Sequence, residues 1–254
     1  MLLRQLAWLC CLALWLPAAE AAEAAEDMNS SACMPYIGER MVFSVGWEFI
    51  HGGTATMETT AKKLGGYRIT TTAKSNKMVD LFRKVRDTII SEGQCVDGRM
   101  QSELLTLDQH EGKYRSKKRT EFDWRDEKVT FTHNDNSKEF DLPTGFLDII
   151  DAFYSVRGLP LELGKELLVP VFDNGKQYDV VVRVLKKEKR WAPWKKPVDC
   201  WVIEPILKTA GIFTSKGKMK IWITDDERRI PLEVTAKLKF GRIIARLVDY
   251  QSVS

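Results

Sequence analysis

Three polar side chains of different chemistry recur at intervals of three in one short segment: Asp151, Tyr154 and Arg157. Residues three apart on a helix lie on neighbouring turns of the same side. If that side packs on strands, each polar group needs a hydrogen-bond partner, so we expect a buried polar seam and treat the three as candidate ligand-binding residues. The alternative is that all three are exposed and contribute almost nothing to stability. The partners we expect are Asp173 or Asp225 for Arg157, and Arg86 for Asp151.

A pair of carboxylates in the same segment suggests catalysis. Asp148 and Asp151 fall on one side of the predicted helix, where two acids could act on a glycosidic bond. Acids interleaved with Ile149, Ile150 and Phe153 are also typical of the exposed flank of an amphipathic helix. The sequence has no Gly-x-Ser-x-Gly motif and only three histidines. We therefore expect that the protein is not an enzyme, with a glycan hydrolase as the alternative.

Basic and aromatic side chains share faces of predicted strands. Arg115, Lys117 and Arg119 alternate along the chain, so they form one row that could bind phosphates or carboxylates. The alternative is solubilising charge on an exposed strand. Trp47 shares one face of a predicted strand with apolar residues such as Phe43 and Val45, and Trp222 shares one with Lys218 and Lys220. We expect both tryptophans to contribute to a ligand-binding surface that combines an apolar hollow with a cationic rim.

Neither a metal site nor a cofactor site is expected. His110 and Glu111 are neighbours on a predicted strand, so they point to opposite faces and would not converge on one ion. Cys33, Cys95 and Cys200 match no zinc or redox spacing. Their number allows one disulfide and one free thiol, and the sequence leaves the pairing open.

Two-residue alternation of apolar and polar side chains dominates the chain from Gly38 onward. This period is typical of antiparallel strands with one buried face. Turn residues separate the runs at Gly65-Gly66, Asn174-Gly175, Asp225-Asp226 and Gly241. Only residues 146–154 show helical spacing, ahead of Gly158 and Pro160. We expect a predominantly all-β fold: a large curved antiparallel sheet or incomplete β-barrel with one central helix, formed by a single domain over residues 37–252.

The first 21 residues have the layout of a cleavable secretory signal, with Arg4, an apolar run from Leu6 to Leu16, Pro17 and a small-residue cleavage site. The apolar run is shorter than the roughly 20 residues that span a bilayer, and no later stretch is apolar enough to span. Residues 22–36 have no apolar periodicity, and we expect a flexible leader. These features predict an exported protein that is periplasmic or associated with the outer membrane.

Five short motifs occur in order along the chain: Gly38-Glu39-Arg40-Met41-x-Phe43, Glu111-Gly112-Lys113-Tyr114, Asp151-Ala152-Phe153-Tyr154-x-x-Arg157, Phe172-Asp173-x-Gly175-Lys176 and Lys216-Gly217-x-x-x-Ile221-Trp222-Ile223-Thr224-Asp225-Asp226. Together they resemble the DUF3108 family of exported bacterial proteins of unknown function. The resemblance covers about residues 38–250. It implies a β-rich envelope protein with a signal sequence and no established catalytic residues. Many relatives have a second tyrosine where this chain has Phe153.

Three functions of different classes fit these observations. We favour a non-catalytic envelope protein that binds an amphiphile or glycan, or that supports outer-membrane or cell-envelope assembly. The second is a scaffold that acts through envelope protein partners at exposed strand edges. The third is the glycan hydrolase. The formal net charge of +4 favours anionic lipid, lipopolysaccharide or acidic glycan over nucleic acid as the partner.

Overall fold

The computed structural model describes residues 33–209, 212–213, 219–239 and 241–252, and within them the chain is mostly antiparallel strand. The first half contains β1 (Arg40–Trp47), β2 (Ile50–Ala61), β3 (Gly66–Ser75), β4 (Arg86–Val96), β5 (Arg99–Glu111), β6 (Tyr114–Asp123), β7 (Lys128–His133) and β8 (Asn136–Asp141). The second half contains β9 (Glu166–Asp173), β10 (Lys176–Trp191), β11 (Pro197–Thr209), β12 (Ile212–Phe213), β13 (Met219–Thr224), β14 (Pro231–Lys237) and β15 (Arg242–Gln251). The helix α3 (Ile149–Gly158) connects the halves, and two short helical turns, η1 (Lys63–Gly65) and α2 (Lys77–Asp80), lie between strands of the first half.

The strands form one continuous sheet that begins at β8, runs back through β1 to β15, and ends at β9. Strands that are consecutive in the chain and adjacent in the sheet form hairpins, as the turn residues predict. Between β9 and β10, for example, Asn174 and Gly175 both have positive φ, of 50° and 70°, which suits the twist of a two-residue hairpin turn. Because β8 and β9 do not pair, the sheet stays open. The expected fold class, a curved antiparallel sheet or incomplete barrel with a central helix, is confirmed.

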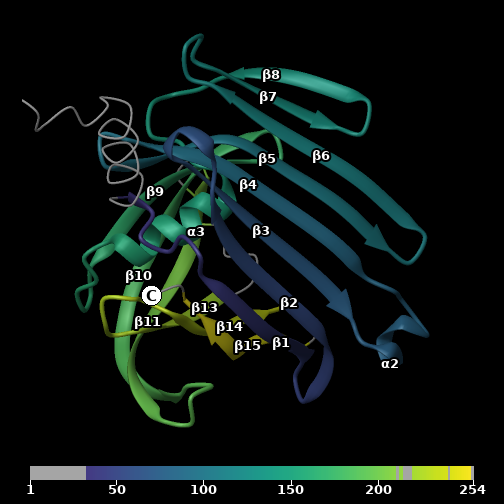
Figure 1. The fold of residues 1–254 in the computed structure, drawn as a ribbon, viewed down its shortest axis with the longest axis vertical. Coiled ribbons are helices and arrows are strands. Elements are labelled where there is room, and N and C mark those ends of the chain that lie inside the picture. The colour runs from purple at the N-terminus through teal and green to yellow at the C-terminus, as the bar shows by residue number, and fades with distance from the viewer. Residues whose placement is uncertain (1–32, 210–211, 214–218, 240, 253–254) are drawn as a thin grey trace, which may run out of the picture.

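The long sheet curls around α3 (Figure 1), which packs against β9 and β5. A parallel bridge between Leu147 and Val171 ties the segment before the helix to β9. One side of α3 contributes Tyr154 to a core cluster that draws on strands of both halves, and the other contributes Ala152 and Val156 to a cluster with β9 to β13. A sheet of this many strands curls rather than staying flat. The curled sheet therefore encloses the helix.

The acids of α3 are not on an exposed flank. Asp148 and Asp151 are both fully buried, so the interpretation of an amphipathic helix with exposed carboxylates is wrong. Asp148 is the N-cap, and its side chain accepts hydrogen bonds from the backbone amides of Ile150 and Asp151. A buried N-cap carboxylate satisfies amides that would otherwise lack partners at the start of the helix.

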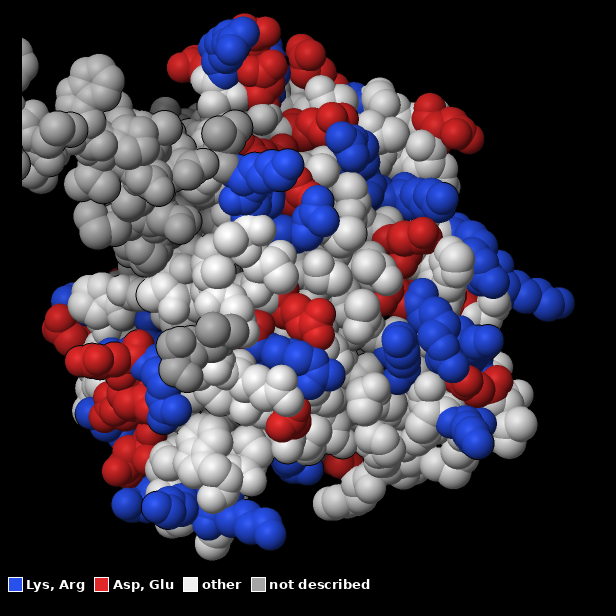
Figure 2. Space-filling model, viewed as in Figure 1, with Lys and Arg blue, Asp and Glu red and all other residues white. Residues whose placement is uncertain are grey.

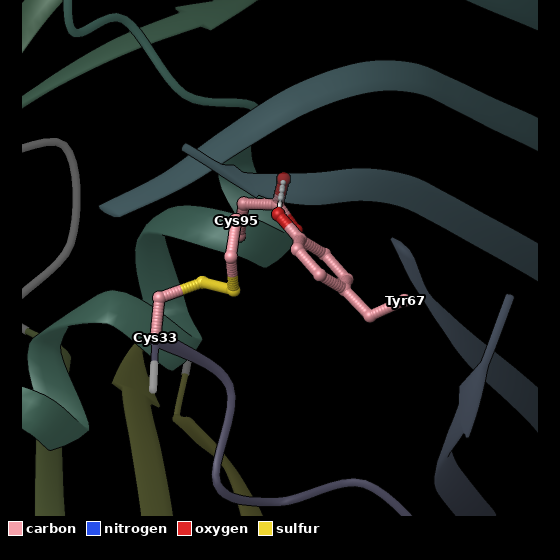
Figure 3. Close-up of a disulfide and its surroundings, with 4 residues drawn as sticks. Cys33, Tyr67 and Cys95 are labelled. Carbon is pink, nitrogen blue, oxygen red and sulfur yellow. Dashed lines mark hydrogen bonds between the residues drawn. A yellow bond between two sulfur atoms is a disulfide. The ribbon is translucent and has the colours of Figure 1, made fainter. Parts of the chain in front are cut away.

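The structured domain starts earlier than expected. Cys33 forms a disulfide with Cys95 of β4, across 62 positions of sequence, and Figure 3 shows the Tyr67 ring beside it. Met34 and Tyr36 are buried in the same core cluster. The prediction of a flexible leader over residues 22–36 is therefore wrong for its last four residues. The predicted signal, residues 1–21, and the rest of the leader lie outside the described residues. Cys200 is a buried free thiol, so one disulfide and one free cysteine are present in the described part of the chain.

Within the described ranges, no helix is both long and apolar enough to cross a membrane.

Candidate functional site: an apolar cavity beside buried carboxylates

A cavity of about 740 Å³ lies between α3 and the concave face of the sheet. Its walls are overwhelmingly apolar, because the two-residue period sends every second side chain of each strand to this face. Helix α3 contributes Ala152, Phe153 and Val156. The strands contribute residues such as Phe43, Ala55, Met57, Val180, Val182, Ile203, Ile221 and Ile223.

The cavity has an apolar, half-exposed rim. Ile149, Leu207 and Met219 line it and are 37 to 40 % exposed, so they lie where the cavity meets solvent. Only a few polar residues are among those that line the space; Arg183 of β10 and Glu204 of β11 are directly opposite each other in the sheet, and they follow the inward-facing Val182 and Ile203, so their side chains point to the other face. Arg183 also donates from Nε to the Glu166 carboxylate, at 2.6 Å. Polar side chains among many apolar ones are typical of sites that hold an apolar ligand with one polar end.

A hydroxyl-lined cage encloses the two carboxylates at the start of α3. Ser91 Oγ lies 2.8 Å from Asp148 Oδ2 and 2.8 Å from Asp151 Oδ1. The hydroxyls of Tyr67 and Ser102 both donate to Asp151 Oδ2. Ser102 Oγ in turn accepts from the backbone N–H of Asp148, at 2.9 Å. Strands β3, β4 and β5 thus each supply one hydroxyl to the helix.

The contacts and pKa shifts of the two carboxyl groups indicate that one of them carries a proton. Ser91 has a single hydroxyl hydrogen, so it can donate to only one of its two carboxyl neighbours. Burial, followed by the charge of Asp151, raises the pKa of Asp148 well above its ordinary value. Burial also raises the pKa of Asp151, but hydrogen bonds from Ser102, Ser91 and Tyr67 oppose this shift. We infer that Asp151 is ionised and that neutral Asp148 donates to Ser91.

A buried ion pair fixes the other end of the helix. Arg157 Nη1 and Nη2 lie 2.6 and 2.7 Å from the two carboxylate oxygens of Glu39, and both side chains are essentially inaccessible. The guanidinium carbon lies 3.6 Å from the centre of the Tyr36 ring, a cation–π contact. Burial would lower the pKa of Arg157, but hydrogen bonding and the charge of Glu39 raise it above its ordinary value. The guanidinium therefore stays charged.

The polar seam predicted for α3 exists, but its predicted partners are wrong. Asp151, Tyr154 and Arg157 are all buried. Arg157 pairs with Glu39 rather than with Asp173 or Asp225, and Asp151 accepts from hydroxyl groups rather than from Arg86. Arg86 instead binds Asp80. The Tyr154 hydroxyl has no hydrogen-bond partner among the described residues, although the seam hypothesis requires one.

The other candidate residues make none of the hydrogen bonds and ion pairs of this seam that are described above. Arg115, Lys117 and Arg119 do share one exposed face of β6, as the alternation predicts, and Arg119 pairs with Glu121. Trp47, at the end of β1, is 43 % exposed. Trp222 is buried, donates to Glu188 and lies under the Arg190 guanidinium. None of the eight candidate ligand-binding residues lines the cavity.

Sequence reasoning missed most of the cavity and cage. Alternation places Val180 and Val182 on a buried face, but it does not show that the face encloses a space rather than a filled core. Ser91 and Ser102 look like ordinary strand residues. Glu39 precedes Arg157 by 118 positions, and no local spacing connects them. No group of three potential metal ligands occurs among the described residues.

Comparison with known proteins places the chain in a family and a fold. A family model described as "Protein of unknown function (DUF3108)" matches residues 42–248. No curated protein matches the chain. A similar solved structure is a beta-barrel-like protein of domain of unknown function DUF1849 from Brucella abortus, with a TM-score of 0.61 and 11 % sequence identity. The alignment covers 86 % of this chain and 99 % of that chain, and at this identity it shows the fold alone. Neither description names a catalytic activity.

Proposed function

The chain belongs to the DUF3108 family of proteins of unknown function, and from this premise we propose that it is a non-catalytic, exported envelope protein that holds the apolar part of an amphiphile in the cavity beside α3. The observation that carries this proposal is the cavity itself. Its volume of about 740 Å³ is within the roughly 300–1,000 Å³ that is usual for small-molecule sites. Protein interiors are normally close-packed and contain few voids larger than a water molecule, so an internal space of this size indicates a binding site.

The rim supports an amphiphile rather than a wholly apolar ligand. Ile149, Leu207 and Met219 are half-exposed, so an acyl chain can enter over apolar side chains. Thr71 and Tyr178 are polar residues among those that line the cavity, and their hydroxyl groups suit a polar end group. A glycan would need many more hydrogen-bonding groups than these walls supply, because each buried hydroxyl must be paired.

Export is supported by two independent features. Residues 1–21 have the layout of a secretory signal. The Cys33–Cys95 disulfide is of the kind that persists in oxidising compartments such as the bacterial periplasm.

The buried carboxylates do not favour the hydrolase alternative. Asp148 caps the helix and Asp151 accepts from three hydroxyls, so both are engaged in structural contacts. Neither residue lines the cavity. A glycosidase needs its two carboxyl groups on either side of a bound sugar.

A fluorescent long-chain acyl probe tests the proposal directly. Ala55→Phe would fill part of the cavity, whereas Thr56→Phe adds the same bulk to the opposite face of the same strand. We expect the first variant to weaken probe binding at least about tenfold, equivalent to about 1.4 kcal/mol, and the second to leave it unchanged.

Thermal unfolding of both variants confirms that each is folded before binding is compared. Native mass spectrometry of the unmodified protein should also show a bound amphiphile. Absence of probe binding by the folded, unmodified protein would overturn the proposal. A scaffold that works only through protein partners predicts that result, together with protein adducts on crosslinking in the native envelope.

A further inference from the structure

One end of the sheet carries large apolar side chains in full contact with solvent. Phe49 is 98 %, Phe82 89 % and Leu81 81 % exposed. These residues, with their exposed neighbours, come from the β1–β2 hairpin and from the α2 region, and we call them together the apolar tip. Its members are Trp47, Phe49, Ile50, Met78, Leu81 and Phe82.

The two segments of the tip are held together rather than placed by chance. The backbone N–H of Asn76 donates to the Gly52 carbonyl, at 2.8 Å, and its side-chain amide donates to the His51 carbonyl, at 2.6 Å. The Asn76 side chain also accepts from Val79 and caps α2. In Figure 1 the β1–β2 hairpin and α2 are at the same end of the sheet. The apolar tip is therefore built into the fold.

Basic residues outnumber acids at this end of the molecule. The segment from Lys74 to Arg86 contains five basic residues and one acid, Asp80. The adjoining β5–β6 turn adds Lys113 and Arg115, with the acid Glu111 paired to Arg83, and a hydrogen bond from Gly112 N–H to the Lys84 carbonyl joins this turn to the segment after α2. In Figure 2, Lys and Arg side chains gather along the flank of the view where these segments lie.

We propose that the apolar tip docks the protein onto an anionic lipid bilayer, with the surrounding cations on the headgroups. Protruding apolar and aromatic side chains within a basic surround are typical of peripheral membrane contacts. Each cation close to an anionic bilayer adds to the attraction. The tip consists of convex turns, which a bilayer interface accommodates without a matching pocket. This inference goes beyond the cavity and does not depend on it.

Vesicle co-sedimentation tests the proposal. We expect the protein to bind vesicles that contain phosphatidylglycerol, and to bind vesicles of pure phosphatidylcholine much less. The variant Leu81→Ser/Phe82→Ser should reduce partitioning at least about tenfold, because two large apolar side chains no longer enter the interface. Leu163→Ser is the matched control, since Leu163 is 61 % exposed but lies in the loop after α3. It should bind like the unmodified protein.

The charge contribution has its own variant. Lys77→Gln/Lys84→Gln should weaken binding to the anionic vesicles and reduce its salt dependence, because exposed charges are screened over about 10 Å at 0.1 M salt. Trp47 provides a direct readout: brominated lipids should quench its emission, and the change should be missing in Trp47→Phe. If residues 1–32 alone mediated binding, all of these variants would bind the vesicles as strongly as the unmodified protein does.

Three results would overturn the proposal. The first is failure of the unmodified protein to bind either vesicle. The second is equal loss of binding in the serine variant and in the Leu163 control. The third is capture of a protein through the tip while vesicles remain unbound. The acyl-probe assay contains no bilayer. A negative result with vesicles therefore contradicts only the docking proposal, and a negative result with the acyl probe contradicts only the cavity proposal.

Discussion

Arg157, near the end of α3, forms a bidentate ion pair with Glu39, the residue immediately before β1, at 2.6 and 2.7 Å in a fully enclosed site. The same guanidinium donates to the backbone carbonyls of Arg228 and Arg229, each at 3.0 Å. One side chain thus joins the helix, the start of the first strand and the turn between β13 and β14. These three parts of the chain are far apart in sequence.

Breaking this pair should cost far more than breaking an exposed one. Arg157→Ala or Glu39→Ala leaves one buried charge without its partner, and we expect each to lower the free energy of unfolding by about 3–5 kcal/mol. Arg40 and Glu58 form an exposed pair in the same region. Arg40→Ala should cost less than about 1 kcal/mol. Urea unfolding of the three variants measures the difference, and similar costs at both pairs would show that the seam is not a stabilising unit.

Asp148, in the hydroxyl-lined cage, should make the free energy of unfolding depend on pH. Its pKa is raised in the folded state, so the folded protein binds more protons than the unfolded chain above about pH 4. The cage contribution is therefore fully present at lower pH and is lost as pH rises through the folded pKa. Several acids outside the cage, including Glu92 and Asp226, have lowered pKa values and act in the opposite direction.

The variant Asp148→Asn isolates the contribution of Asp148 to the pH dependence of stability, because the other acids are unchanged in it. Asparagine is also a good N-cap, and its amide can donate to Ser91 as the neutral acid does. The free energy of unfolding of this variant, minus that of the unmodified protein, should rise with pH above about pH 4. Asp148→Ala should instead lower stability by about 0.5–2 kcal/mol through loss of the cap alone. A difference that is flat with pH would contradict the assignment of the proton to Asp148.

Two buried tyrosines should respond differently to loss of the hydroxyl. Tyr67 donates to Asp151, at 2.8 Å, so Tyr67→Phe should cost about 1–3 kcal/mol. The Tyr154 hydroxyl has no partner among the described residues, so Tyr154→Phe should be neutral or stabilising. The two variants remove the same atom from equally buried rings, and thermal unfolding compares them. A large loss in Tyr154→Phe would reveal a partner for its hydroxyl.

The disulfide should contribute substantially to stability. Its cysteines are 62 positions apart, and closing a loop of that length stabilises the folded state by about 4 kcal/mol in the chain-entropy account. Cys33→Ser/Cys95→Ser should lower the free energy of unfolding by about this amount, and a reducing agent should do the same to the unmodified protein. Cys200→Ala tests the specificity of the effect: a reducing agent should destabilise this variant as much as the unmodified protein.

The sequence alone determined the fold class, the hairpin order and the helix. The alternation along β1 and β10 and turn residues such as Asn174-Gly175 are local properties of the sequence. They can therefore be recognised without knowing any tertiary contact. The intervals of three between Asp151, Tyr154 and Arg157 placed them on one side of α3 for the same reason. The family resemblance also came from local motifs, and the match to residues 42–248 confirms it.

Only the tertiary structure decided what those residues contact. Whether Asp148 is exposed or buried depends on how far the sheet curls over α3, and this curl sums small twists over many strands. The same curl leaves a cavity beside Val182 and Ala152 instead of a filled core. The Glu39–Arg157 pair and the Ser91 and Ser102 hydrogen bonds join positions 46 to 118 residues apart. Such contacts leave no periodic signal, because each requires only one suitable side chain on each partner.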